Sequence, residues 1–322
     1  MKKILGIGNA LVDILVEVHD ESLLKKFGLK KGGMEMINVD LKNEIHREIH
    51  GLKQTVVSGG STSNTIYGLA QLGAPTGYIG KIGEDDMGCF FQKDMEKAGV
   101  ATHLLHSEID TGIATTFITK DGERTFATYL GAAATQTPDD LHERIFSLYD
   151  IIHVEGYLIF NKDLILSICK LAKKCGLQIS MDMASYNLVE VMHPLVEELL
   201  RDYVDIIFAN EEEAFAFTGK KEHEALEILS TYCSVSVVKL GAHGSLARVN
   251  GETTVIPAAK AQCKDSTGAG DIYAAGFLYG LINDYTVADA GALASKLSAR
   301  CIETIGARIM QSNAVCGMRY EV

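Results

Sequence analysis

The sequence predicts an α/β fold in which a mostly parallel β-sheet is flanked by helices and carries a small β-rich lid. Short apolar runs alternate with amphipathic stretches along most of the 322 residues, a pattern typical of strands buried beneath helices on both faces. Two regions with strand character interrupt this alternation, residues 14–57 and 109–131. The length suits one large domain with an appendage, or two domains.

The predicted strands of the large sheet are short runs rich in Ile, Val and Leu. They comprise residues 4–8, 76–82, 151–154, 178–183, 206–209 and 235–240. The amphipathic segments between them predict helices at residues 63–72, 88–98, 162–175, 194–202, 211–218, 222–232, 269–282 and 286–304. Asp86 and Asn161 stand where helix-capping residues belong.

The two interrupting regions predict a lid. Residues 109–131 have the pattern of a β-hairpin, with IATTFIT and RTFATYL on either side of a turn at 120–123. Residues 14–57 combine the strand-like ILVEV with a charged, helix-like stretch at 21–26. We therefore expect a discontinuous lid, 14–57 and 109–131, inserted into a large α/β domain. That domain is expected to comprise residues 1–13, 58–108 and 132–322.

The charge and cysteine content exclude several classes of protein. Asp and Glu (42) exceed Lys and Arg (30), and no basic cluster occurs, which argues against nucleic acid or an anionic membrane as the main partner. The seven cysteines include no C-x-x-C pair, so we expect reduced thiols and no zinc knuckle. No apolar run approaches the length of a membrane span, and Asn9 and Asp13 interrupt the apolar start. These features predict a cytoplasmic protein.

The sequence DSTGAGD at residues 265–271 is the strongest chemical signal. Small residues at a loop-to-helix junction let backbone N–H groups face an anion, which the helix dipole also favours. Asp271 follows in the first helical turn, where a carboxylate would repel a phosphate. Its position is explained if it accepts a proton from an attacking hydroxyl. The alternative is a glycine-rich turn with a helix-favouring acid.

Three further motifs have polar residues where ligands are expected to bind. In GGSTSN, Gly59 and Gly60 allow close approach of the backbone, and Asn64 can donate to and accept from a hydroxyl. The motif is equally explained as a plain turn before a helix. Asn9 and Asp13 flank the end of the first strand and could chelate vicinal hydroxyls, or simply satisfy local backbone groups.

Polar residues also follow two later strands, at the edge where doubly wound sheets bind ligands. Asn210 and Glu213 offer oxygens that suit a hydrated Mg²⁺, although an acidic first helical turn explains them as well. Lys239, Gly241 and Gly244 form a strand that runs into glycines, which suits the phosphates or ribose of a nucleotide.

Several other motifs are absent or incomplete. The Gly6–Gly8 start of a dinucleotide fingerprint has Leu11 in place of the third glycine, and there is no P-loop and no G-x-S-x-G elbow. HREIH at residues 46–50 is not H-E-x-x-H, so we interpret His46 and His50 as part of a solvated helical face.

Taken together, GGSTSN at 59–64, N-x-x-E at 210–213 and DSTGAGD at 265–271 resemble the PfkB, or ribokinase-like, family of carbohydrate and nucleoside kinases. The resemblance spans about residues 4–310. It implies a Rossmann-like α/β/α sandwich with a β-rich lid. Within the family the chain is most similar to adenosine kinases, through GNALVDI at 8–14, the helix-like insertion near 21–31 and DIIFANEEEAF at 205–215.

The resemblance also implies a role for each motif. It makes Asp271 the general base and Gly268, Ala269 and Gly270 the anion hole. It implies that the acceptor is held by Asn9, Asp13, Gly59, Gly60, Asn64, Arg124 and Tyr157, the last as a base-stacking surface. It implies that ATP and Mg²⁺ are bound by Asn210, Glu213, Lys239, Gly241 and Gly244, with Glu213 acting on the metal through water. A monovalent cation, such as K⁺, is implied beside Asp265 and Gly306.

The acceptor and the oligomeric state stay open. The expected function is transfer of the γ-phosphoryl group of ATP to a primary hydroxyl of a ribose-containing substrate, with adenosine or a related purine nucleoside favoured and a role in purine salvage implied. A family member acting on free ribose, fructose or a similar sugar is the first alternative, and a non-catalytic nucleoside sensor is the second. A monomer and a homodimer are both compatible with the sequence. The tail after Gly306-Ala307 lacks the proline common in the family.

Overall fold

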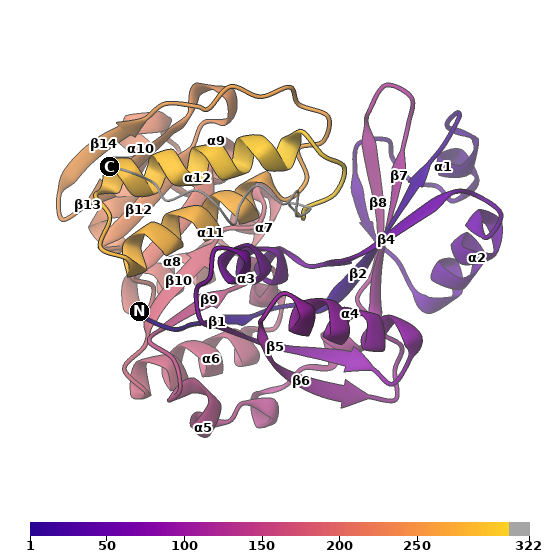
Figure 1. The fold of residues 1–322 in the computed structure, drawn as a ribbon, viewed down its shortest axis with the longest axis horizontal. Helices are drawn as coiled ribbons and strands as arrows, with labels where there is room; N and C mark the ends of the chain where they lie inside the picture. The colour runs from indigo at the N-terminus through magenta and orange to yellow at the C-terminus, as the bar shows by residue number, and fades with distance from the viewer. Residues whose placement is uncertain (309–322) are drawn as a thin grey trace.

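Two β-sheets lie side by side in the computed structural model, which describes residues 1–308 (Figure 1). The larger has nine strands in the order β14-β13-β12-β11-β10-β9-β1-β5-β6 and is flanked by helices. The smaller has five strands in the order β3-β8-β7-β2-β4. The prediction of an α/β fold with a large parallel sheet is therefore confirmed.

Seven neighbouring strands of the large sheet are parallel, because each connection between them crosses over the sheet. They are β1 (Ile4–Ile7), β5 (Thr76–Gly83), β6 (Ala101–Ser107), β9 (Ile151–Val154), β10 (Gln178–Asp182), β11 (Ile206–Asn210) and β12 (Val235–Lys239). The antiparallel strands β13 (Ser245–Val249) and β14 (Glu252–Ile256) extend one edge. All seven parallel strands therefore present their carboxyl ends at the same side.

Helices cover both faces of the large sheet. One face packs against α3 (Ser61–Gln71), α4 (Asp86–Lys97), α11 (Ala269–Ile282) and α12 (Val287–Ile302). The other packs against α6 (Lys162–Lys174), α7 (Tyr186–Val191), α8 (His193–Asp202), α9 (Glu211–Thr218) and α10 (Glu222–Tyr232). The strand side chains alternate between these two cores; in β1, Ile4 joins the first and Leu5 the second. The short helix α5 (Glu143–Phe146) precedes β9.

The five-stranded sheet has a core of its own. It comprises β2 (Leu11–Glu17), β3 (Met34–Met36), β4 (Gln54–Gly59), β7 (Gly112–Ile118) and β8 (Arg124–Tyr129), with α1 (Ser22–Lys26) and α2 (Val39–Ile49). Strands β7 and β8 form the expected antiparallel hairpin. Buried side chains from β2, α1, α2 and β7 form one cluster, which includes Ile14, Leu24, Ile45 and Phe117. The first chain segment of this sheet, β2 to β4, runs from Leu11 to Gly59. It therefore begins and ends slightly outside residues 14–57, the boundaries expected for the first lid segment.

Strands β6, β13 and β14 and the short helices α5 and α7 were not predicted, and α5 has only four residues. Strands β6, β13 and β14 lie toward the edges of the large sheet, where polar side chains face water and interrupt the apolar run that marks a buried strand. Helix α7 has six residues, too few for a clear helical period. The tail that lacks the family's proline lies, beyond Arg308, outside the described residues.

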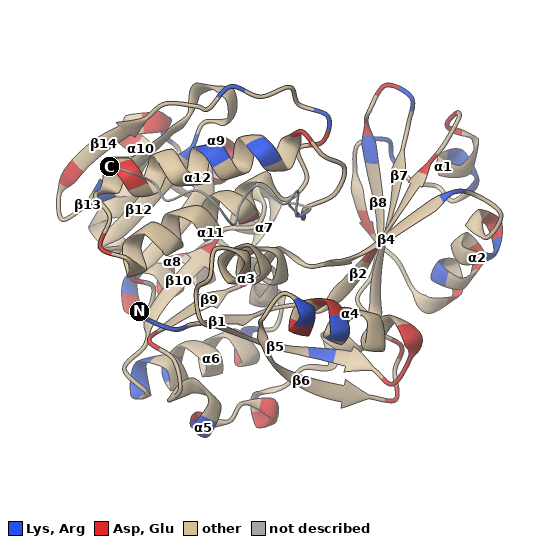
Figure 2. Ribbon diagram, in the orientation of Figure 1, with Lys and Arg blue, Asp and Glu red and all other residues tan. Residues whose placement is uncertain are grey.

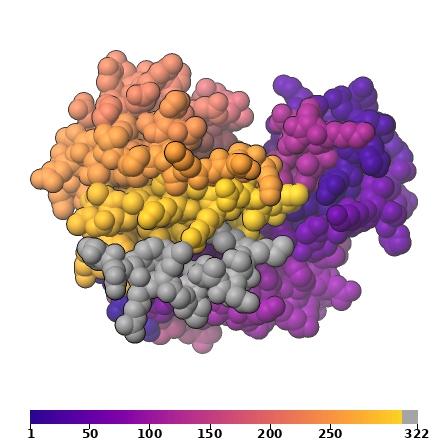
Figure 3. Space-filling view, turned by 45° about the horizontal axis from the view of Figure 1, so that its top comes forward, coloured from indigo at the N-terminus to yellow at the C-terminus, as the bar shows by residue number. Residues whose placement is uncertain are grey.

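The surface agrees with the mixed charge of the sequence. Figure 2 shows acidic and basic residues interspersed along the helices and loops around both sheets. No helix within residues 1–308 combines the length and the apolar character that crossing a bilayer requires. Figure 3 shows a hollow between the surface of the large sheet and that of the five-stranded sheet.

Candidate active site

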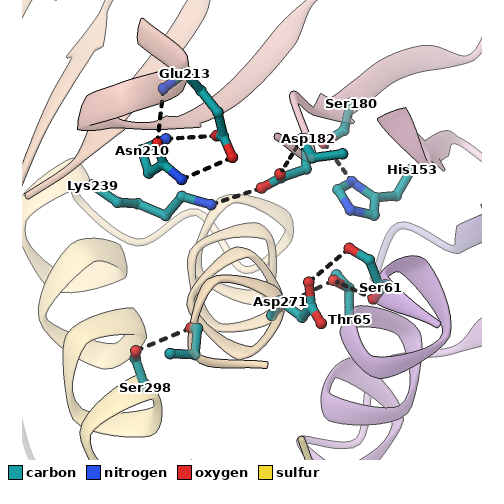
Figure 4. Close-up of polar contacts among 12 residues, drawn as sticks. Ser61, Thr65, His153, Ser180, Asp182, Asn210, Glu213, Lys239, Asp271 and Ser298 are labelled. Carbon is teal, nitrogen blue, oxygen red and sulfur yellow. Dashed lines mark hydrogen bonds and ion pairs between the residues drawn. The ribbon is translucent and has the colours of Figure 1, made fainter. Parts of the chain in front are cut away.

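Asp271 lies in the first turn of α11 and joins that helix to the start of α3. Its Oδ1 accepts a hydrogen bond from Ser61 Oγ at 2.7 Å, and its Oδ2 accepts one from Asn64 Nδ2 at 2.9 Å. Thr65 Oγ1 donates to the Asp271 carbonyl at 3.1 Å. Figure 4 shows Ser61 and Thr65 directed at Asp271. The structure thus brings together two predicted motifs that lie about 200 residues apart in the sequence.

The surroundings of Asp271 set its proton affinity. Burial raises the pKa of its carboxyl from 3.8 to about 6, although the hydrogen bonds from Asn64 and Ser61 oppose the rise. The negative charge of Asp182 raises the pKa further, and the positive charge of Lys239 lowers it. A carboxylate with this pKa is mostly ionised at neutral pH and is well matched to accepting a proton.

In the turn before Asp271, Gly268 and Gly270 lie close to neighbouring atoms. Gly268 has φ +74°, and a Cβ on it would lie 2.3 Å from the Cβ of Ala307. A Cβ on Gly270 would lie 3.0 Å from Lys239 Nζ. Ser298 Oγ on α12 donates to the Ala269 carbonyl at 3.0 Å, which braces the turn from behind. The backbone N–H groups at the start of α11 and the ammonium of Lys239 therefore share one small region, which favours an anion.

Lys239, at the end of β12, is held by a carboxylate. Its Nζ lies 2.7 Å from Asp182 Oδ2, and both side chains are largely buried. Burial would lower the pKa of Lys239, but the charges of Asp182 and Glu213 outweigh burial and raise that pKa well above its usual range. Lys239 is therefore a permanent cation beside the predicted anion hole (Figure 4).

Asn210 and Glu213 satisfy one another at the start of α9. Asn210 Oδ1 accepts from the Glu213 N–H, while the Glu213 carboxylate accepts from the N–H and the Nδ2 of Asn210, each at 2.8 Å. This arrangement is a capping box. The acidic first helical turn that was the alternative explanation of Asn210 and Glu213 is therefore present. Burial and the nearby Asp182 raise the pKa of Glu213 to about 7. No group of three His, Cys, Asp or Glu within residues 1–308 is arranged as a direct metal site.

Gly241 and Gly244 shape the turn after β12. They have φ +53° and +92°, and the Leu240 N–H donates to the Gly244 carbonyl at 2.8 Å. A Cβ on Gly244 would lie 2.1 Å from the Ile256 carbonyl oxygen. Glycine is required at Gly244 both by the left-handed backbone and by this close approach.

Asn9 is held by a residue that the sequence analysis missed. Its Nδ2 donates to Glu155 Oε1 at 2.6 Å, and Glu155 Oε2 accepts from the Thr62 N–H at 3.2 Å. Burial raises the pKa of Glu155 to about 7, although these hydrogen bonds oppose the rise. Glu155 directly follows β9, so an acid at the carboxyl end of an apolar strand was the signal available for it.

Gly59 and Gly60 pack closely against Asp13 and Asn9, respectively. A Cβ on Gly59 would lie 2.2 Å from Asp13 Oδ1, and a Cβ on Gly60, where φ is +89°, would lie 2.3 Å from the Asn9 carbonyl oxygen. Burial raises the pKa of Asp13 to about 7, partly offset by the charge of Arg308. Residues 9, 13, 59 and 60, all predicted to bind the acceptor, therefore lie together.

Arg124 and Asp265 connect the two sheets. Arg124 Nη2 on β8 lies 2.5 Å from Asp265 Oδ2, and Asp265 also accepts from the N–H groups of Thr267 (2.9 Å) and Gly306 (2.5 Å). The carboxylate is thus surrounded by nitrogen donors and already has a cation. Arg124 thus lies where the resemblance implies a monovalent cation beside Asp265 and Gly306, and that cation stays a prediction.

Two aromatic residues lie behind the carboxyl edge of the sheet. Tyr157 is partly buried, and its hydroxyl donates to the Ala184 carbonyl at 3.4 Å. His153, which the sequence analysis did not select, is fully buried and bonds Ser180 Oγ through Nδ1 at 2.9 Å. Burial lowers the pKa of His153 to about 4, so it is neutral beneath Asp182 (Figure 4).

Comparison with known proteins places this site in a family. Residues 24–314 match the model of the pfkB family carbohydrate kinases. The crystal structure of adenosine kinase from Sinorhizobium meliloti is 33% identical, with 98% of each chain covered and a TM-score of 0.88.

Two further proteins are similar. A probable sugar kinase from Rhizobium etli has 30% identity, a TM-score of 0.88 and coverage of 97% of this chain and 96% of its own. The 5-dehydro-2-deoxygluconokinase of Geobacillus thermodenitrificans is 28% identical over 77% of this chain and 80% of its own. Members of the matched family transfer a phosphoryl group from ATP, with Mg²⁺, to an alcohol group of a small molecule. The chain belongs to the pfkB family, and it is a sugar or nucleoside kinase.

Proposed function

We propose that this chain transfers the γ-phosphoryl group of ATP to the primary, 5′-type hydroxyl of adenosine or a related purine nucleoside. The observation that carries the proposal is the position of Asp271. Its carboxylate has a pKa of about 6 and lies at the start of α11, between the anion-favouring turn and the cluster of Asn9, Asp13 and Gly59. A hydroxyl held by that cluster would meet a base and a phosphate-binding turn at once.

The proposed reaction needs few groups from the protein. Asp271 takes the proton of the acceptor hydroxyl as the new oxygen–phosphorus bond forms and the bond to the ADP oxygen breaks. The N–H groups of Gly268, Ala269 and Gly270 and the ammonium of Lys239 stabilise the charge that develops on the transferred group. Gly241 and Gly244 are proposed to line the nucleotide site.

Asn210 and Glu213 are the residues proposed to hold Mg²⁺ through its water shell. Carboxylate and amide oxygens suit this hard cation, and both side chains lie at the carboxyl end of β11. When bound, the ion would neutralise phosphate charge. Because the two side chains also cap α9, their substitution is expected to affect the local fold as well.

We also propose that the five-stranded sheet is the lid. Residues 14–57 and 109–131 are proposed to close on the acceptor and exclude water that would otherwise take the phosphoryl group. The proposal is supported by the hollow between the two sheets and by the Arg124–Asp265 pair that spans them.

The preference for a purine nucleoside rests on Tyr157 and on similarity to adenosine kinases. Tyr157 is a partly buried ring at the same edge of the sheet as Glu155 and Asp182. A base can stack on such a ring, whereas a free sugar gains little from it. A free sugar, as in ribose or fructose kinases, is the second candidate, because sugar kinases are similar to the chain to nearly the same degree.

One experiment separates these functions. The purified chain with ATP and Mg²⁺ is tested for ADP release with adenosine, inosine, cytidine, ribose, fructose and 5-dehydro-2-deoxygluconate. We expect adenosine to give the highest kcat/KM. A higher value for a sugar would assign the chain to the sugar kinases. Tight binding of a nucleoside without ADP release from any acceptor would instead support a non-catalytic sensor.

A further inference from the structure

Arg308 is a buried arginine whose hydrogen-bond acceptors belong to the segment around Gly59 and Gly60. Its side chain is 7% exposed, and its Nε donates to the Ser58 carbonyl at 3.0 Å. Its Nη2 donates to Ser58 Oγ at 3.1 Å and to Ser63 Oγ at 3.2 Å. These acceptors are uncharged. The guanidinium therefore holds two serines that bracket the glycine pair.

The contacts continue from the serines to the glycine backbone. Ser63 Oγ donates to the carbonyls of Gly59 and Gly60, the latter at 3.0 Å. Those glycines in turn touch Asp13 and Asn9 so closely that neither could carry a side chain. A displacement at Ser63 would thus be transmitted directly to the surface where the acceptor is proposed to bind.

Packing fixes the guanidinium itself in one orientation. Its Cζ lies 4.0 Å from the centre of the Tyr67 ring on α3, a cation–π contact. Nη1 and Nη2 lie 3.8 and 3.7 Å from Met95 Sδ on α4. The planar fork, with donors that diverge at fixed angles, can reach both serines at once, which an ammonium cannot do.

The charges around Arg308 are arranged toward the same segment. Asp94 receives a hydrogen bond from Ser58 Oγ, so it closes a chain from Arg308 through Ser58. Asp13 interacts electrostatically with Arg308. The charges of Asp271, Arg124 and Asp265 act on the Asp13 carboxyl as well. Tyr67 and Tyr78 also interact electrostatically with Arg308.

From these contacts we infer that Arg308 is a positioning residue for the acceptor site. It holds the segment from Ser58 to Ser63 against Asn9 and Asp13, and it touches neither the predicted base nor the predicted ATP site. This inference rests on the proposed function, because it concerns the acceptor of that same reaction. It predicts that loss of Arg308 weakens acceptor binding selectively.

The test compares Arg308→Met, Arg308→Lys and Ser63→Ala with wild type. Arg201→Met serves as the matched control, because Arg201 is an exposed arginine on α8 paired with its neighbour Asp202. Affinities for adenosine, D-ribose and ATP are measured by calorimetry, and acceptor KM and kcat by ADP release. A melting curve for each variant identifies any that fails to fold.

We expect Arg308→Met to weaken binding of the preferred acceptor about 10- to 100-fold, as loss of charge-assisted hydrogen bonds does. Arg308→Lys keeps the charge without the fork and should recover part of that loss. Ser63→Ala, a milder change that keeps the protein testable if Arg308→Met does not fold, should weaken it about 3- to 10-fold. In each variant kcat and ATP affinity should stay within about threefold.

Two results would overturn the inference. Unchanged acceptor affinity in Arg308→Met and Ser63→Ala would show that acceptor binding does not depend on the contacts of Arg308 with the segment from Ser58 to Ser63. Equal loss of acceptor and ATP affinity, with a lower melting temperature, would make the role a general structural one. A wild-type protein that binds adenosine or ribose without phosphorylating it would overturn the proposed function, while the binding measurements would still decide the role of Arg308.

Discussion

The two sides of the candidate active site are built differently. On the side of the large sheet, the polar groups described are paired within one motif or between strands of that sheet, as in the Asn210–Glu213 capping box and the Lys239–Asp182 pair of β12 and β10. On the side of the five-stranded sheet, contacts join distant parts of the chain. Asn9 and Glu155 are 146 residues apart, and Ser58 and Arg308 are 250 apart.

Both sides contain buried polar atoms without a hydrogen-bond partner among the described residues, and His153 Nε2 beneath Asp182 is one on the side of the large sheet. Asn64 Oδ1, Thr62 Oγ1 and Arg124 Nη1 are buried and have no hydrogen-bond partner among the described residues. All three belong to the acceptor side or to the contact between the sheets. Because buried polar atoms are normally paired, these atoms are available to a ligand. We expect the acceptor to pair these atoms when it binds, and we expect the side of the large sheet to bind the phosphoryl group.

The largest expected effect is on the base that both sides share. Asp271→Asn keeps the size of the side chain and removes its proton affinity, so kcat should fall about 10²- to 10⁴-fold while acceptor and ATP affinities change less than about fivefold. Steady-state kinetics and calorimetry measure the two quantities. Asp86→Asn is the matched control, since Asp86 also lies in a first helical turn, that of α4, and is not among the residues proposed for the active site. Retention of more than about a third of kcat would exclude Asp271 as the base.

The next largest effect is expected for Lys239, where the loss of kcat and the loss of unfolding free energy can be separated. Lys239→Met leaves Asp182 as an uncompensated buried charge, which should cost about 3–5 kcal/mol of unfolding free energy and lower kcat about 10²-fold. The double variant Lys239→Met with Asp182→Leu should recover most of the stability. Denaturant unfolding and kcat are measured on both variants.

Activity decides the meaning of the double variant. If Lys239 stabilises the transferred phosphoryl group, the double variant stays as slow as the single one. If the pair is purely structural, kcat should return along with stability. Recovery of kcat would therefore contradict the proposed role of Lys239.

A smaller effect is expected where the acceptor base would stack. Tyr157→Ala should narrow the preference for adenosine over ribose about 5- to 150-fold, because stacking on an aromatic ring is worth about 1–3 kcal/mol. Tyr157→Phe is the control, since it keeps the ring and removes the hydrogen bond to Ala184. Specificity constants for both acceptors are compared in all three proteins. An unchanged ratio in Tyr157→Ala would show that the base binds elsewhere.

The smallest effect is a pH dependence of stability from the acceptor side. The pKa of Asp13 is about 7 in the fold and 3.8 in the unfolded chain, so the folded state holds this proton more tightly. Its contribution to stability is complete below about pH 4 and is lost as the pH rises toward about 7.

The melting temperature should therefore fall between about pH 5 and about pH 7.5, and Asp13→Asn should reduce that fall by a few degrees. Glu35→Gln, an exposed acid on β3, should leave the fall unchanged. Glu155, Glu213 and Asp271 also have raised pKa values, so part of the fall should persist in Asp13→Asn. An identical fall in wild type and Asp13→Asn would contradict the shifted pKa of Asp13.

How far the sequence predicts this molecule follows the same division. The α/β fold and the hairpin β7–β8 could be predicted, because buried strands and turns have local patterns. DSTGAGD and N-x-x-E could be located for the same reason. Glu155 was missed although it follows an apolar strand, whereas Arg308 could not be located, since it stands in no motif and acts through a partner 250 residues away. The contact of Asp265 with Arg124 of β8 could not be predicted either, because it forms only in the folded chain.

The contact between Arg308 and Ser58 has a consequence for how the protein is made. At about 5–20 residues per second, the ribosome adds the 250 residues between them in about 12–50 s. During that time the segment around Gly59 and Gly60 can form within the emerging α/β structure, but the arginine that holds it has not been synthesised. A nascent chain would therefore complete its proposed acceptor site only after Arg308 has been added, long after Ser58 and the strands around it have been synthesised.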